Sequence, residues 1–399
     1  MKKKRLLILG AGFLQTHVIR KAKELGYYVI AVDGNPHAPG FSYADASETI
    51  DIVDTERCLA FAKKQQIDGV MTAATDYGVV AAAVIAETLL LPGIGAQTAR
   101  TVRDKYAVHE LLRGGKVDDS MPAYEVASHE DIVKIAPPIE YPVMIKPCNG
   151  SGSRGVIRAD NEAELHAAFD AAGAASKTGK ALIERFIGGA EYGAEAIVYN
   201  GVPFVLAIMK KWMTQPPYYA ELGHAVRSGL SETLEEKVRK AVEQAIFSLG
   251  IHTGAVNMDF LISHDETIYI IDVGARMGGN LIGSHIVPMG TGYDYMGNLI
   301  RIAVNDPVDR PEITHIRPVA TRLLALSPGT VKHLPDFDAI EKRYGVSIIH
   351  RLTVGSRIAP YRTNLDGCGY VIATGSDVVQ PEKRVSAALL EVEQSIVRC

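Results

Sequence analysis

Short apolar runs alternate with amphipathic stretches throughout the first hundred residues, and this alternation is the strongest constraint on the fold. Strands that alternate with helices at such spacing form a parallel sheet with right-handed crossovers. We therefore predict an α/β unit over residues 1–103. The runs typical of buried strands are 5–9, 27–33 and 68–73, and the stretches with helical spacing are 13–25, 54–66 and 78–90.

The pattern changes after this unit. Residues 104–137 are typical of a helix followed by a linker, and a second unit begins near Pro138. After Pro311, short strands and a last helix from about Pro381 form a third, small unit. Between these points we predict a strand over 141–147, antiparallel strands over 180–187 and 191–201, a helix over 232–249, and a hairpin over 254–276 that turns at 264–266.

Composition excludes several classes of protein. Hydrophobic residues are 47% and charged residues 22% of the chain, as in ordinary globular proteins. A net charge of −4 does not provide the basic surface expected of a nucleic-acid-binding protein. The four cysteines are scattered, which favours neither a disulfide framework nor a zinc site. No apolar stretch is long enough to cross a bilayer, so we expect a cytoplasmic protein that binds neither nucleic acid nor membrane.

The glycine-rich turn GAGFLQ (residues 10–15) resembles a dinucleotide-binding fingerprint only in part. The fingerprint requires a third glycine for close contact between helix and strand, and this chain has Gln15 there. Asp33 ends the second strand, as a ribose-binding acid would. An NAD-dependent oxidoreductase is therefore a weak alternative, and a turn that closes the sheet, with room for a small anion, is the simpler interpretation.

The segment IKPCNGSGSRGV (residues 145–156) indicates a phosphate site. Lys146 leaves a strand, and a loop with three glycines and two serines follows, so that backbone N–H groups can converge on phosphate oxygens. It is not a P-loop, because its lysine precedes the glycines. The alternative is a flexible hairpin tip.

A pair of aspartates indicates a metal site. Asp259 and Asp272 lie on the two strands of the predicted hairpin, and alternation places both carboxylates on one face if the register allows. A divalent cation relieves the repulsion between such carboxylates, and beside phosphates that cation is Mg²⁺. Aspartates on strands also cap turns or pair with arginine. Arg276 can stabilise charge on a transferred phosphoryl group and can at the same time neutralise Asp272, and Gly278 and Gly279 allow a substrate to approach the backbone.

Taken in order, four segments resemble the ATP-grasp superfamily, in particular its carboxylate–amine (amino-acid) ligase branch. They are DKYAVHELL (104–112), IKPCNGSGSRGV (145–156), LIERFIGGAEYGAE (182–195), and DFLI with IIDVGARMGGN (259–262 and 270–280). The resemblance implies a mixed α/β and α+β fold. Its expected parts are a Rossmann-like preATP-grasp domain (1–103), an ATP-grasp domain (104–310) with a lid (about 138–187) and an antiparallel catalytic sheet (about 188–310), and a C-terminal subdomain (311–399).

The resemblance also implies site residues. Catalytic roles fall on Arg276, Lys146 and His224, the last within YYAELGHAVRSGL (218–230), which is similar to a segment near the acceptor site of amino-acid ligases. Metal ligands are Asp259 and Asp272, and substrate contacts are His224, Arg276, Gly278, Gly279 and Asn280. ATP contacts are Lys105, Lys146, Gly150, Ser151, Gly152, Ser153, Gly155, Glu184, Arg185, Phe186, Ile187 and Glu191.

One departure from the family pattern concerns position 274. The family usually has Glu-x-Asn-x-Arg where this chain has Asp272-Val273-Gly274-Ala275-Arg276, so the asparagine that completes metal coordination is replaced by glycine. The consequences left open are a displaced metal, one metal in place of two, reliance on Asn257 or Asn280, or loss of activity.

The implied activity is that of an ATP- and Mg²⁺-dependent, ADP-forming C–N ligase, with Mn²⁺ as an alternative metal. A substrate carboxylate becomes an acyl-phosphate, and an amine then displaces phosphate. Rival hypotheses are a bicarbonate-using carboxylase of the purine-pathway kind and a nucleotide-binding protein with weakened catalysis. The expected partners are small carboxylates and amines, and a homodimer is plausible because closed twofold dimers are common.

Overall fold

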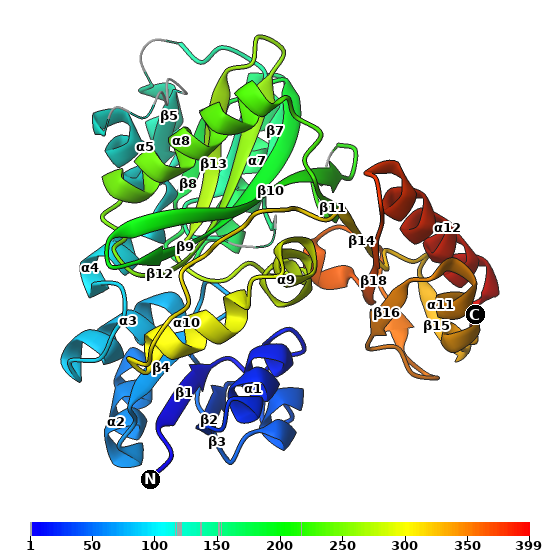
Figure 1. Cartoon of the computed structure of the whole chain (residues 1–399). Helices are drawn as coiled ribbons and strands as arrows, with labels where there is room; N and C mark the ends of the chain where they lie inside the picture. The colour runs from blue at the N-terminus through cyan, green and yellow to red at the C-terminus, as the bar shows by residue number, and fades with distance from the viewer. Residues whose placement is uncertain are drawn as a thin grey trace.

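The computed structural model describes the 399-residue chain except residues 1, 116, 118–121, 136, 137, 151, 153 and 217. In Figure 1 the N-terminal strands and helices (blue) lie below a large antiparallel sheet (green), and the C-terminal segment (orange to red) lies to its right. Within the described ranges, no helix combines the length and the apolar character that a bilayer crossing requires.

The N-terminal part is a parallel sheet with strand order β3-β2-β1-β4, which confirms the predicted α/β alternation. The unpredicted strand β3 is polar and mostly exposed, so it carries no apolar signal. The elements are β1 (Arg5–Leu9), α1 (Gln15–Glu24), β2 (Tyr28–Asp33), η1 (Pro39–Tyr43), β3 (Ala46–Thr49), α2 (Thr55–Gln65), β4 (Gly69–Thr72), α3 (Val79–Thr88) and α4 (Ala96–Val102).

Gln15 covers the glycine-rich turn between β1 and α1. Its Nε2 donates a hydrogen bond to the carbonyl oxygen of Ala73 at 2.7 Å. A Cβ atom on Gly12 would lie 2.9 Å from Oε1 of Gln15. A side chain therefore fills the space beside the turn, where a dinucleotide fingerprint would have its third glycine.

The lid is a second, four-stranded antiparallel sheet with order β5-β8-β6-β7, and α7 packs on it. The glycine-rich loop joins β6 to β7, and Gly152 and Gly155 have φ angles of +69° and +70°, which other residues rarely adopt. The elements are α5 (Lys105–Gly114), β5 (Ala123–Val126), α6 (His129–Val133), β6 (Val143–Pro147), β7 (Ile157–Ala159), α7 (Glu162–Ala175) and β8 (Ala181–Arg185).

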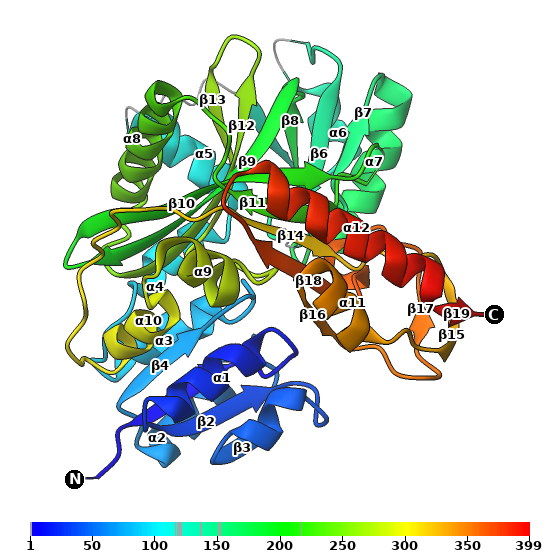
Figure 2. The ribbon, with the colours of Figure 1, turned by 45° about the vertical axis from the view of Figure 1, so that its right-hand side comes forward.

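The largest sheet has eight strands in the order β13-β12-β9-β10-β11-β14-β18-β16. Its β9–β10 hairpin turns at Asn200-Gly201. Figure 2 shows its strands beside the lid strands β6 and β8. The elements of the central region are β9 (Gly189–Tyr199), β10 (Val202–Met213), β11 (Glu221–Val226), α8 (Glu232–Ser248), β12 (Gly254–Ser263), β13 (Ile268–Gly274), the π-helix η2 (Ile282–Ile286), α9 (Val287–Thr291) and α10 (Tyr295–Ala303).

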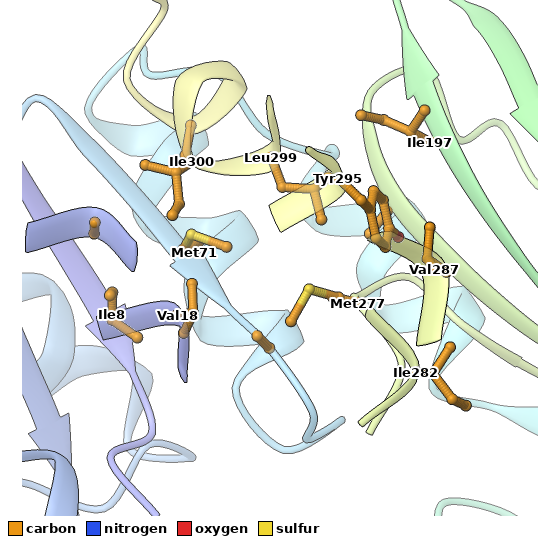
Figure 3. Packing of buried hydrophobic residues seen from close by; sticks show 14 of the residues in the cluster. Ile8, Val18, Met71, Ile197, Met277, Ile282, Val287, Tyr295, Leu299 and Ile300 are labelled. Atoms are coloured by element: carbon orange, nitrogen blue, oxygen red, sulfur yellow. The ribbon is translucent and has the colours of Figure 1, made fainter. Parts of the chain in front are cut away.

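Each face of this sheet belongs to a different core. One face packs against α8 and α5 through residues such as Met258, Phe260 and Val242. The other face packs against α9, α10 and the N-terminal sheet, so that Ile197 of β9 and Ile8 of β1 belong to one apolar cluster (Figure 3).

The C-terminal segment continues the central sheet and adds a small sheet of its own. β14 pairs with β11 through Ala225–Ala320 and Val226–Val319, while a further core forms beneath α12. A small sheet of order β17-β15-β19 lies beyond it. The elements are β14 (Val319–Leu323), β15 (Gly329–His333), α11 (Phe337–Tyr344), β16 (Ser347–His350), β17 (Arg357–Ile358), η3 (Asn364–Asp366), β18 (Gly369–Thr374), α12 (Val379–Ser395) and β19 (Val397–Arg398).

Candidate active site

Asp259 of β12 and Asp272 of β13 lie directly opposite each other in the strand register. Met258 and Phe260, which flank Asp259 in the chain, pack into the core that the sheet forms with α8. Alternation along the strand therefore turns the side chain of Asp259 to the other face of the sheet. Directly opposed residues have Cβ atoms about 4.5–5.5 Å apart. The prediction that the hairpin brings these two residues together is confirmed.

Lys211 adds a buried ammonium group to the same face. Its Nζ lies 2.6 Å from Oε1 of Glu191, 2.8 Å from Oε1 of Glu221 and 2.9 Å from Oδ2 of Asp259, and its side chain is 1% exposed. Sequence reasoning gave no role to Lys211 or Glu221. The available signal was a lysine at an inward position of an apolar strand, but the adjacent Lys210 makes the pair resemble a solvated surface.

This carboxylate cluster carries surplus negative charge. Burial raises the pKa of Asp259 to about 7, and repulsion from Glu221, Glu191 and Asp272 adds to the rise against the attraction of Lys211. Burial also acts to raise the pKa of Glu221, but Lys211 outweighs it and holds that pKa at about 2. Since one ammonium group serves three carboxylates, a further cation would stabilise the site.

The donor set fits a magnesium ion that binds together with phosphates. Among the described residues, no three His, Cys, Asp or Glu side chains are placed to hold a metal by themselves. Mg²⁺ in nucleotide sites is commonly held by one or two carboxylates plus substrate phosphates and water, and Asp259 with Asp272 supplies that pair. The nearby amides have other partners, because Oδ1 of Asn257 accepts from Arg276 at 3.0 Å and Oδ1 of Asn280 accepts from Tyr370 at 2.9 Å.

Two lysines from the lid side reach this cluster. Lys105, at the start of α5, forms an ion pair with Asp272. Nζ of Lys146, on β6, lies 2.7 Å from Oε1 of Glu184 and donates to the carbonyl oxygen of Ile271 at 2.8 Å. Burial acts to raise the pKa of Glu184, but Lys146 and His109 lower it overall. The basic groups are therefore held in place by carboxylates before any phosphate enters.

A first cavity of about 440 Å³ lies between the lid and the central sheet. Trp212 lines this cavity. The guanidinium carbon of Arg322 lies 3.7 Å from the centre of the Trp212 ring. Gly155 does not line the cavity, and Ser151 and Ser153 lie outside the described residues. The predicted site residues in its wall are Lys105, Lys146, Gly150, Gly152, Glu184, Arg185, Phe186, Ile187, Glu191, Asp259 and Asp272.

A second cavity of about 450 Å³ adjoins the first. It is built by all parts of the chain, because Asp76 and Tyr77 come from the N-terminal part and Asn364 and Tyr370 from the C-terminal segment. Of the predicted substrate contacts, Arg276, Gly279 and Asn280 line it. The residues common to both cavities are Gly152, Arg154, Glu221, Asp259 and Asp272.

Arg154 of the glycine loop and Glu221 of β11 were both missed by sequence reasoning. Arg154 donates to the hydroxyl oxygen of Tyr77 and lies over its ring, which joins the lid to the N-terminal part. Glu221 accepts from Nδ2 of Asn364 at 2.9 Å and also from Asn280. These contacts join segments far apart in sequence, so no local pattern marks them.

His224 and Gly278 lie behind the cavity walls. His224 is buried, with Nε2 4.0 Å from Oε1 of Glu221, and its Nδ1 has no hydrogen-bond partner within the described structure. Burial lowers the pKa of His224 to about 4, which keeps the ring neutral. The amide of Gly278 donates to Oε1 of Glu195 at 2.8 Å, and a Cβ atom there would lie 2.7 Å from Oε2 of the same carboxylate. Neither residue lines a cavity, and their roles toward substrate stay predictions.

Comparison with known proteins identifies two domains in this chain. Residues 139–284 match the ATP-grasp domain, and residues 322–397 match the L-amino acid ligase C-terminal domain 2. The chain therefore contains an ATP-grasp domain followed by an L-amino acid ligase C-terminal domain. Its fold is similar to that of the L-amino acid ligase from Bacillus licheniformis, with a TM-score of 0.83, 23% identity and full coverage of both chains.

Two further proteins are also similar to this chain. The formate-dependent phosphoribosylglycinamide formyltransferase of Bacillus subtilis is 28% identical over 193 residues, which are 46% of this chain and about half (48%) of the length of that relative. The biotin carboxylase domain of the Hydrogenobacter thermophilus 2-oxoglutarate carboxylase, in complex with MgADP and bicarbonate, has a TM-score of 0.78 at 19% identity. The match covers 100% of this chain and 91% of the biotin carboxylase domain chain. ATP-grasp domains bind ATP with Mg²⁺, and enzymes of the family are ADP-forming ligases.

Proposed function

We propose that this ATP-grasp protein activates a carboxylate as an acyl-phosphate and couples it to an amine, with L-amino acids as the substrate class. The shared wall between the two cavities carries the proposal. A nucleotide in the first cavity and a carboxylate in the second would meet at Asp259, Asp272 and Glu221. Such a geometry suits the transfer of a phosphoryl group from one cavity to the other.

Charge placement supports ATP in the first cavity. Lys105 and Lys146 are the ammonium groups for its phosphates, in line with the usual reliance of phosphoryl transfer on positioning and charge neutralisation. In this proposal the backbone of Arg185 to Ile187 faces the adenine and Glu191 faces the ribose. Mg²⁺, held by Asp259 and Asp272 with the phosphates, would supply further positive charge.

The proposed reaction has two steps. A carboxylate oxygen of the first substrate attacks the γ-phosphorus, the bond to the β–γ bridging oxygen breaks, and ADP leaves. The amine nitrogen of the second substrate then attacks the acyl carbon, phosphate leaves, and the nitrogen gives up a proton. Arg276 lines the cavity where the acyl-phosphate would form and provides a fixed positive charge there. The lid excludes water, because an acyl-phosphate otherwise hydrolyses.

The second cavity and its C-terminal wall support the proposed substrate class. Asn364 and Tyr370 belong to the segment that matches the L-amino acid ligase C-terminal domain. The acidic cluster with Glu221 favours an ammonium group, and Arg276, Arg154 and Arg351 supply positive charge suited to a carboxylate. An α-amino acid carries both groups.

The test is ADP release from ATP and Mg²⁺ by the purified chain with pairs of L-amino acids, with separate arms for formate plus an amine and for bicarbonate plus an amine. Release that requires two amino acids, together with a dipeptide product, is the expected result. Release that requires bicarbonate or formate instead, or no release in any arm, would overturn the proposal.

A matched pair of variants locates the activity. Asp259→Asn removes a carboxylate from the shared wall, whereas Asp265→Asn changes an exposed carboxylate in the turn of the same hairpin, where its partners are Ser263 and Thr267. We expect only the first to lose turnover. Equal activity of the two variants would contradict the assignment of the site.

A further inference from the structure

Arg276 is held by a carboxylate from a distant part of the chain. Its Nε and Nη2 donate to Oδ1 and Oδ2 of Asp76 at 2.9 and 3.1 Å, and its Nη1 donates to Oδ1 of Asn257 at 3.0 Å. The side chains of Arg276 and Asp76 are only 14% and 11% exposed. A two-point pair of this kind fixes the plane of the guanidinium group as well as its position.

The loop that carries Asp76 is joined to the segment that carries Arg276. This loop follows β4 of the N-terminal sheet, and the amide of Ala74 donates to the carbonyl oxygen of Met277 at 3.0 Å. Ala73 forms a parallel β-bridge with the same residue. The carboxylate and the arginine therefore share one backbone frame, although 200 positions separate them in sequence.

Gly274 provides the space that this ion pair fills. A Cβ atom on Gly274 would lie 3.0 Å from Cζ of Arg276 and 3.1 Å from Oδ1 of Asp76, which is already tighter than most contacts. An asparagine, which the resemblance leads one to expect at this position, adds three heavy atoms beyond Cβ. Its Cβ atom alone requires the pair to shift by a few tenths of an ångström.

A second carboxylate supports the arrangement from behind. Glu195 is buried and accepts from Nδ2 of Asn257 at 3.0 Å, from the amide of Gly278 at 2.8 Å and from the hydroxyl group of Tyr295 at 2.7 Å. With its amide nitrogen held by Glu195, Asn257 turns its oxygen toward Arg276. The acceptor oxygen of Asn257 is thus fixed in orientation.

We propose that Asp76 is a positioning residue for Arg276, supplied by the N-terminal part of the chain, and that glycine at position 274 is the counterpart that admits it. What Arg276 does rests on the proposed function, but the pairing of Asp76 with Gly274 does not. Asp76 and Arg276 line the second cavity and not the first. Their loss should therefore act on the coupling chemistry and not on the binding of ATP.

The kinetic test compares Asp76→Ala and Asp76→Asn with Asp68→Asn. Asp68 belongs to the same N-terminal part and accepts from the amide of Arg5, away from both cavities. We expect kcat to fall about 10- to 100-fold in the two Asp76 variants, because small misplacements of a catalytic group have effects of that order. The KM for ATP should stay within about twofold. An unchanged kcat, or a loss confined to the KM for ATP, would overturn the proposal.

The second test needs neither nucleotide nor substrate, so it separates this inference from the proposed function. The melting temperature is measured for Gly274→Asn, Asp76→Ala and the double variant, with Gly274→Ala as a milder form if the asparagine variant does not fold. We expect Gly274→Asn to lower the melting temperature of the native chain and to lower it by less than half as much in the Asp76→Ala background. Equal losses in both backgrounds would show that the two positions do not interact, and would overturn the pairing.

Discussion

Replacement of Lys211 by methionine tests the electrostatics of the site most directly. The change removes the ammonium group that lies 2.6–2.9 Å from Glu191, Glu221 and Asp259, and it keeps most of the volume of the side chain. Loss of one partner from a buried ion pair costs about 3–5 kcal/mol, because an uncompensated charge remains. At about 1.2 °C per kcal/mol for a chain of this length, the expected fall in melting temperature is roughly 4–6 °C at pH 8.

The sign of the pH dependence follows from the carboxylates. Asp259 already has its pKa raised to about 7 in the folded protein, and removal of Lys211 raises it further. A group whose folded pKa lies above its unfolded value stabilises the fold at low pH and loses that contribution as pH rises through the folded pKa. The loss in Lys211→Met should therefore be smaller at pH 6 than at pH 8. Millimolar Mg²⁺ should restore part of it, because a divalent cation can take the place of the ammonium group.

The assay is thermal unfolding at both pH values, with and without MgCl₂. Lys180→Met is the matched control, since Nζ of Lys180 lies 2.7 Å from Glu125 but the two side chains are 44% and 25% exposed. Such a pair contributes only about 0–1 kcal/mol. If Lys211→Met melts within about 1 °C of the native chain at pH 8, or loses the same amount at both pH values, the account of the cluster is wrong.

Three further predictions concern other parts of the site and fold. Asp272→Asn should lower the rate of ADP release at least about 100-fold. The melting temperature should fall by only about 2 °C, because the Asp272 side chain is 46% exposed and pairs with Lys105. Turnover at the native rate would contradict this prediction. Burial and the nearby His285 lower the pKa of His17 to about 4, so the stabilising contribution of His17 is complete above pH 6.5 and is lost as the pH falls toward 4. The unfolding midpoint of His17→Gln in urea should therefore depend less on pH over this range, and an unchanged slope would count against it. Asn364→Ala should raise the KM for the substrate of the second cavity and leave the KM for ATP unchanged, since this side chain lines only that cavity; a change confined to ATP would reverse the assignment of the cavities.

Local patterns predicted the parts of this fold whose residues lie close together in sequence. The hairpin that pairs Asp259 with Asp272 has its register determined by a short turn and by apolar alternation, and both are visible in one segment. The N-terminal α/β unit was predictable for the same reason. In contrast, residues 180–187 and 191–201 were predicted as antiparallel strands in succession, but β8 belongs to the lid sheet and β9 to the central sheet.

The unpredicted site residues owe their positions to long-range packing. Asp76 meets Arg276 across 200 residues, and Lys211 acquires three carboxylate partners only when β9, β11 and β12 assemble around β10. Arg154 was visible within the glycine loop, but its contact with Tyr77 depends on how the lid sits on the N-terminal part. None of these contacts follows from periodicity or from spacing.

The join between β11 and β14 bears on how such a chain can diversify. Ala225–Ala320 and Val226–Val319 are the two registered residue pairs that carry the sheet into the C-terminal segment, and one wall of the second cavity depends on what lies beyond them. A joint of so few backbone pairs is easy to reproduce when one homologous segment is exchanged for another. Recombination near residue 318 would thus exchange the C-terminal wall of the second cavity in a single event, while the residues that line the first cavity stay unchanged.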